Sequence, residues 1–171
     1  MFDLIDGIPV HVFVVHAVVV LLPLAVVGTI VVASVPRWRG SCGPLVVAAA
    51  LVATVLTQLA TSSGKDLEKP VGDVGEHAEL GDRLIWFAIP LLVLVTSLGA
   101  AAAQQQPGDP QRRRADRPRA GPERPGKSLL MVIGVLAVVA ARASAVQVYR
   151  VGDSGAKAVW GDQVNSSAPR T

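Results

Sequence analysis

Residues 12–35 read VFVVHAVVVLLPLAVVGTIVVASV, and three further apolar runs follow at 44–61, 84–103 and 128–148. Crossing a hydrocarbon core of ~30 Å takes about 20 helical residues, so each run is a candidate span. The runs do not alternate in polarity, and lipid offers the backbone no hydrogen-bond partners. The sequence therefore predicts an all-α polytopic membrane protein, a four-transmembrane-helix bundle, with Pro23 and Pro90 bending two of the helices.

The composition supports this class and excludes others. Hydrophobic residues make up 51% of the 171 residues and charged residues only 17%, which is typical of membrane proteins. The net charge is +3, and the basic residues are concentrated between positions 111 and 127. Because this segment is a loop between two spans, the positive charge does not indicate a nucleic-acid partner. The single cysteine, Cys42, excludes an internal disulfide and a cysteine-based metal or iron–sulfur site.

The loop charges predict the orientation. Residues 36–43 carry Arg37 and Arg39 without an acid, and residues 105–127 carry six arginines and a lysine against three acids. The loop 64–83 carries three basic and six acidic residues. By the positive-inside rule the first two loops are cytoplasmic, which predicts a multi-pass protein with an N-out/C-out orientation. The location expected for it is the bacterial plasma membrane.

The segments divide the chain into a transmembrane domain over residues 1–161 and a flexible tail over 162–171. The basic loop 104–126 is rich in Gln, Pro and Arg, and it is predicted to be disordered and cytoplasmic. Asp73 and Glu76 resemble a capping pair, so the third helix is expected to begin near Val74. Residues 149–161, with several glycines and an aromatic at each end, are interpreted as a turn or short strand on the outer surface.

Polar residues within the spans fall in the outer half, given this topology. On the second span they recur at three- and four-residue spacing, which places them on one helical face expected to point into the bundle. That face serves either helix-to-helix adhesion or a ligand cavity. Its residues are Thr54, Thr57, Gln58 and Thr61.

Arg142 is the least ordinary residue of the spans. About fourteen helical residues separate it from Ser128, which places it ~21 Å across, in the outer third. A charge at that depth either snorkels to lipid headgroups or points inward to an anionic partner, which is an acid of the outer loop or a cofactor's carboxylates.

The three histidines are candidate ligands for iron. His11 and His16 lie about 140° apart around a helix, so they are poor ligands for one ion from one face. His16 and His77 instead suit the two sides of one haem iron, with haem b as the cofactor. Whether His77 reaches His16 or His11 stays open, and so does the alternative that all three only hydrogen-bond within the bundle. Gln58 and Arg142 complete this candidate site.

Several motifs together resemble one family. The paired histidines ahead of Pro23, Ser63-Gly64-Lys65-Asp66-Leu67, His77-Ala78-Glu79-Leu80-Gly81 and Val148-Tyr149-Arg150 resemble the bacterial membrane proteins called domain of unknown function 2231. The resemblance covers nearly the whole chain and implies a four-helix membrane fold and a histidine-centred outer site, with His11, His16, His77 and Gly81 as the transferable positions. It implies no established activity. Some relatives are joined to iron–sulfur domains, which implies a redox association.

The chain departs from the family pattern at three positions. Val12 stands where a proline is usual, and Val146 and Val151 stand where many relatives have histidines. Fewer histidines weaken a metal site in this chain.

Two functions follow as hypotheses. The first is a haem-binding or redox-associated membrane module with its site in the outer half. The alternative is a non-enzymatic membrane binding or assembly module whose polar residues only pack the bundle. Whether the protein is an enzyme stays open, because no segment carries a complete catalytic signature. The expected partners are the lipid bilayer and a membrane redox protein or a second copy of the chain.

Overall fold

The computed structural model describes residues 4–5, 8–71, 76–105 and 126–167, and the side chains of 13–64, 78–104, 126–157 and 160. Four long helices dominate it. They are α1 (Val10–Ser34), α2 (Arg39–Val71), α3 (Glu76–Gln105) and α4 (Lys127–Ser167).

Two small elements accompany the helices. The two-residue strands β1 (Leu4–Ile5) and β2 (Ile8–Pro9) pair antiparallel ahead of α1. A short 3-10 helix, η1 (Pro36–Trp38), joins α1 to α2. None of these three elements is predicted by the sequence pattern.

All four predicted spans are confirmed as helices long and apolar enough to cross a membrane. Only 28–33% of the residues in the most apolar stretch of each span are buried inside the bundle. The remaining apolar surface needs a cover of lipid or protein. The spans are Phe13–Ser34, Pro36–Gly64, Ala78–Gln104 and Lys127–Lys157.

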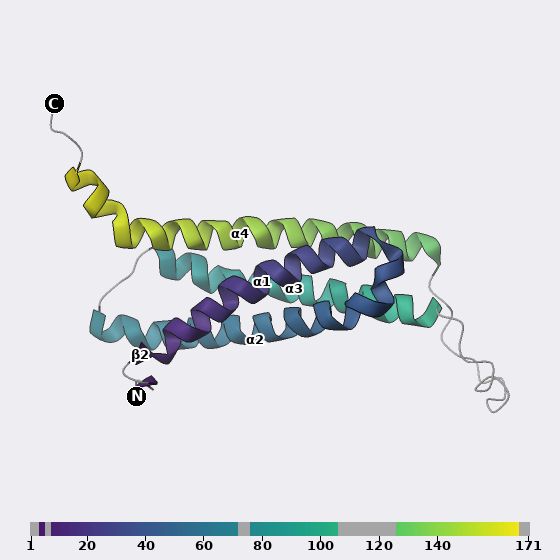
Figure 1. Cartoon of the computed structure of the whole chain (residues 1–171), viewed down its shortest axis with the longest axis horizontal. Coiled ribbons are helices and arrows are strands. Elements are labelled where there is room, and N and C mark those ends of the chain that lie inside the picture. The colour runs from purple at the N-terminus through teal and green to yellow at the C-terminus, as the bar shows by residue number, and fades with distance from the viewer. Residues whose placement is uncertain (1–3, 6–7, 72–75, 106–125, 168–171) are drawn as a thin grey trace.

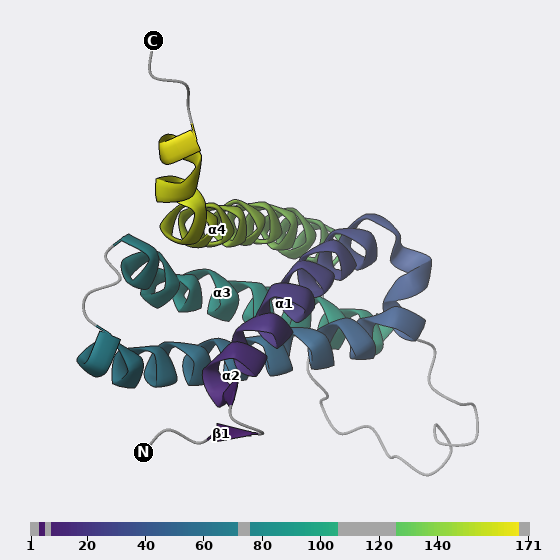
Figure 2. The ribbon, with the colours of Figure 1, turned by 60° about the vertical axis from the view of Figure 1, so that its left-hand side comes forward.

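The helices form an antiparallel bundle in which α1 and α3 each pack against both α2 and α4. Helix α1 crosses its neighbours obliquely, and α1 and α3 lie on one diagonal (Figures 1 and 2). The beginning of α1 and the end of α4 lie at the same end of the bundle (Figure 1). This agrees with both termini lying on one side of the membrane. The assignment of that side as the extracytoplasmic one stays a prediction.

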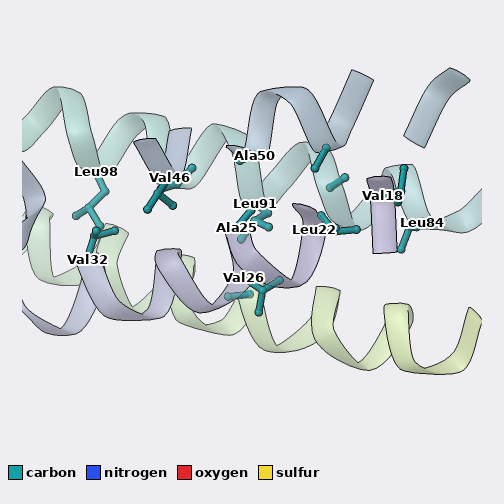
Figure 3. Close-up of a cluster of buried hydrophobic side chains, with 14 of the residues drawn as sticks. Val18, Leu22, Ala25, Val26, Val32, Val46, Ala50, Leu84, Leu91 and Leu98 are labelled. Atoms are coloured by element: carbon teal, nitrogen blue, oxygen red, sulfur yellow. The ribbon is translucent and has the colours of Figure 1, made fainter. Parts of the chain in front are cut away.

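Small and branched side chains fill the core. Leu22 of α1 and Leu91 of α3 are both fully buried, and alanines such as Ala25, Ala53 and Ala137 are equally inaccessible (Figure 3 shows Leu22, Ala25 and Leu91). Small residues let helix backbones approach one another, which compensates in lipid for the missing hydrophobic driving force. The low aromatic content of the sequence suits this mode of packing.

A close approach of this kind lies between α1 and α2 at Gly28. A Cβ added at Gly28 would come within 2.7 Å of Val46 Cγ2. Real Cβ atoms do not tolerate that separation, so α2 lies against α1 only because residue 28 has no side chain.

Helix α2 begins earlier than expected. The predicted loop 36–43 is largely ordered as η1 and the first residues of α2, which starts at Arg39. Arg39 donates from Nε to the Val32 carbonyl (2.9 Å) and from Nη2 to the Ala33 carbonyl (2.8 Å). These bonds satisfy carbonyls at the end of α1 that lack helical partners.

The interpretation of 149–161 as a turn or short strand is wrong, because α4 continues without interruption to Ser167. Two helix-favouring alanines, Ala156 and Ala158, follow Gly155, and Lys157 Nζ lies 2.7 Å from Asp153 Oδ2, one turn away. The yellow end of α4 turns away from the bundle axis (Figure 2). Three glycines, 152, 155 and 161, fall in this part and permit such a bend.

Helix α3 begins at Glu76, close to the predicted start near Val74. Residues 72–75 with the proposed Asp73 cap, most of the basic loop (106–125) and the last residues of the predicted tail (168–171) lie outside the described residues.

Candidate functional site

Two buried polar side chains of α4 bond to α3. Ser144 Oγ donates to the Phe87 carbonyl (3.2 Å) and also lies 2.9 Å from the Ala140 carbonyl of its own helix. Gln147 Nε2 donates to the Leu80 carbonyl (3.0 Å) and is 4% exposed. These contacts join the two helices at the end of the bundle where α3 begins.

The buried threonines bond within their own helices. Thr29 and Thr57 donate to the carbonyls of Ala25 (2.7 Å) and Ala53 (2.8 Å), four residues earlier. Among the described residues, no buried side-chain nitrogen or oxygen lacks a partner. The described part of the interior therefore has no side-chain polar atom that needs a ligand.

The polar face predicted on α2 points inward only in part. Thr57 is 2% exposed, as expected, whereas the inward placement expected of Gln58 is wrong, because its side chain is exposed. It shares an outward stripe with Val55 and Leu59, which are 51% and 50% exposed. Adjacent helical residues are ~100° apart, so Thr57 and Gln58 cannot both enter the narrow buried sector.

His16 also faces outward. Its side chain is exposed and belongs to a stripe on α1 with Val20 and Leu24. His77 is the second residue of α3, and His11 is the second residue of α1. The side chains of His77 and His11 lie outside the described ones.

The structure does not gather the predicted site residues whose side chains it describes. His16, Gln58 and Arg142 each face outward, from three different helices, and α2 and α4 lie on opposite corners of the bundle. No group of three His, Cys, Asp or Glu side chains that could hold a metal ion occurs in the described part of the chain. The binding roles of these residues stay predictions.

Arg142 occupies the outward face of α4 between Val139 and Val146, which are 58% and 59% exposed. The inward placement, one of the two predicted for Arg142, is wrong, because the side chain is exposed. No ion pair joins Arg142 to an acidic side chain that the structure describes. Its charge stands on a face that is otherwise apolar.

Arg142 also lines a groove, here called the α1/α4 groove, that sequence reasoning missed. The groove has a volume of about 710 Å³ and lies between the end of α1, η1, the start of α2 and the first half of α4. Three of its lining residues are cations and none is acidic. The lining residues are Ala33, Ser34, Pro36, Arg39, Lys127, Leu130, Met131, Gly134, Val135, Val138, Val139 and Arg142.

Comparison with known proteins identifies the family. The sequence profile described as "Predicted membrane protein (DUF2231)" matches residues 7–168. The chain belongs to the DUF2231 family. No curated protein and no solved structure matches it. The resemblance inferred from the histidine, glycine and Tyr-Arg motifs is thereby confirmed, and with four spans this DUF2231 chain is a multi-pass membrane protein.

Proposed function

We propose that this DUF2231 protein is a non-enzymatic membrane assembly module that docks against a second membrane protein through the outward face of α4. The observation that carries the proposal is Arg142, a cation exposed between Val139 and Val146 on that face. The interior supports it, because no buried side-chain nitrogen or oxygen among the described residues is left for a ligand to satisfy.

Electrostatics favours a protein partner at this position. A charged side chain at the centre of a bilayer costs roughly 2.5 to 3.5 kcal/mol on insertion scales, and less toward the interface. An acidic side chain on a neighbouring membrane helix would offset that cost by accepting charge-assisted hydrogen bonds from the guanidinium. Arg142 is thus expected to select a partner helix that is polar at the same depth.

The partner is a different protein rather than a second copy. The four apolar runs, 12–35, 44–61, 84–103 and 128–148, contain no Asp or Glu. A second copy therefore offers no acid at the depth of Arg142. A partner with an intramembrane carboxylate complements the charge directly.

A haem-binding or redox-associated function is the second candidate. His16 and His77 lie near the beginnings of α1 and α3, and these two helices begin at the same end of the bundle (Figure 1). His16 faces outward, however, and fully buried side chains fill the space between α1 and α3. The outward direction of His16 does not fit a haem b held inside the bundle of one chain. A haem at His16 would have to lie against the outside of the bundle, beside a partner.

The test of docking is gentle extraction of the tagged full chain from its own membranes. The wild-type protein is expected in a complex with one defined membrane protein, and Arg142→Leu is expected to lose that protein while staying folded. Val146→Leu, which changes an apolar neighbour on the same face, is the matched control and should retain the partner. A monomer for the wild type, or equal recovery with Arg142→Leu, would contradict docking and leave Arg142 snorkelling to headgroups.

An absorption spectrum of the same wild-type preparation tests the second candidate. A Soret band that disappears in His16→Ala would establish haem. A colourless protein from haem-replete cells would refute it.

A further inference from the structure

We propose that the α1/α4 groove is a binding site for an anionic phospholipid, with the phosphate held by Arg39 and Lys127 and an acyl chain lying along α4. The groove is a cationic, mostly apolar recess at the end of the bundle opposite the chain termini. This inference is independent of the docking function proposed for Arg142.

The headgroup end is defined by Arg39. Its two hydrogen bonds, to the carbonyls of Val32 and Ala33, hold the guanidinium in place. A guanidinium carries five N–H donors, so donors remain for the oxygens of a phosphate. Because the side chain is already ordered by capping α1, little of its conformational entropy is lost when a ligand binds.

Lys127 adds the second charge at this end. It is the exposed first residue of α4, and α4 has no acidic residue in its first turn. None of the groove's lining residues is acidic either, so no fixed negative charge among them competes with the phosphate. Two cations beside one apolar recess form the charge complement of an anionic headgroup.

The acyl channel follows from the apolar side of α4. Met131 and Val135 are 72% and 58% exposed, and the position of Gly134 is open, because an added Cβ would meet no atom within 4 Å. From Leu130 to Val139 the helix rises ~14 Å, which is about half of a ~30 Å hydrocarbon core. An acyl chain that extends through one leaflet of the bilayer has about that length.

Arg142 is not part of the headgroup site. It follows Lys127 by fifteen residues, or ~22 Å of helix rise, too far for one phosphate to touch both. A free phosphate ion also fits the groove poorly, because it would leave the apolar wall uncovered. The positive-inside rule places this end in the cytoplasmic leaflet, where anionic lipids are common.

The test compares lipid binding by the purified full chain in pure phosphatidylcholine and in equimolar phosphatidylcholine and phosphatidylglycerol. The wild-type protein is expected to retain phosphatidylglycerol selectively, as counted by native mass spectrometry, and to melt at a higher temperature in the mixed vesicles. Lys127→Gln should weaken the selectivity roughly fivefold, the effect of one basic residue at an anionic surface. Inorganic phosphate added to pure phosphatidylcholine should not reproduce the stabilisation.

Two glycine substitutions separate binding from folding. Gly134→Leu should occupy part of the groove and abolish the preference for phosphatidylglycerol, because a Cβ added at Gly134 would meet no atom within 4 Å. A Cβ added at Gly99 of α3 would likewise meet no atom within 4 Å, and Gly99 lies outside the groove, so Gly99→Leu should bind as the wild type does. Undiminished retention by Gly134→Leu, or no preference in the wild type, would overturn the proposal.

Discussion

The inward face of α4 carries polar residues that bond to a neighbouring helix, whereas its outward face carries a charged residue with no such bond to a described residue. On the inward face, Ser144 and Gln147 are buried and bond to carbonyls of α3. Two residues before Ser144, Arg142 faces outward without an ion pair to a described acid. Ser144 and Gln147 stabilise the packing of α4 against α3. The charge of Arg142 is instead left for a group outside the bundle to neutralise. Polarity in a membrane helix therefore indicates function only once the face is known.

The largest contrast between the faces is expected on α3. Leu91 is fully buried, so Leu91→Ala should lower the free energy of unfolding by about 2–5 kcal/mol through the cavity it leaves. Val93→Ala, at a position 55% exposed, should change it by less than about 0.5 kcal/mol. Reversible unfolding in bicelles measures both. Equal losses would mean that the bundle is assembled with other faces inward.

The next effect concerns the approach of α1 to α2. Gly28→Leu should destabilise the bundle by about 1–3 kcal/mol, because its Cβ would collide with Val46. Val46→Ala combined with Gly28→Leu should recover part of that loss, so a double-mutant cycle should give a favourable coupling. Strictly additive effects in the same unfolding assay would refute the close contact.

A smaller effect is expected for the polar bond between α4 and α3. Gln147→Leu keeps the volume but removes the donor to the Leu80 carbonyl, so it should cost about 1 kcal/mol, as interhelical bonds in membranes do. Gln58→Leu is the matched outward control and should leave the unfolding free energy unchanged. If the two substitutions have the same effect, the inward bond contributes nothing.

The smallest effect on stability is expected for Arg142. Arg142→Leu should alter the unfolding free energy of the isolated protein by less than about 0.5 kcal/mol, because the side chain bonds to nothing described inside the bundle. The measurement uses the purified monomer in bicelles. A loss of several kcal/mol would show that Arg142 has an intramolecular role.

The sequence was sufficient for the spans, because helix length and hydropathy determine what crosses a bilayer. It was insufficient for the faces. Thr57 and Gln58 share a polar pattern, yet only Thr57 is buried, since the buried sector of each helix depends on how its neighbours pack. Glycines at 152 and 155 suggested a turn, whereas local helical contacts such as Lys157 with Asp153 continue α4.

The candidate site was predicted less well than the fold. Arg142 could be singled out from its depth alone, but its outward direction could not. Arg39 and Lys127, which are far apart in sequence, both line the α1/α4 groove, and only the packing of α4 against α1 reveals that they share it. The sequence offered one signal for this groove, namely basic residues that flank two spans on the same predicted side of the membrane.

The most direct test of docking on α4 is photo-crosslinking in intact cells. A photoreactive residue in place of Val146 flanks Arg142, and one in place of Val93 reports from the outward face of α3. The docking proposal predicts one defined protein adduct from position 146, none from position 93, and loss of the adduct when Arg142→Leu is added. Adducts of equal yield from both positions, or an adduct that persists without Arg142, would contradict it.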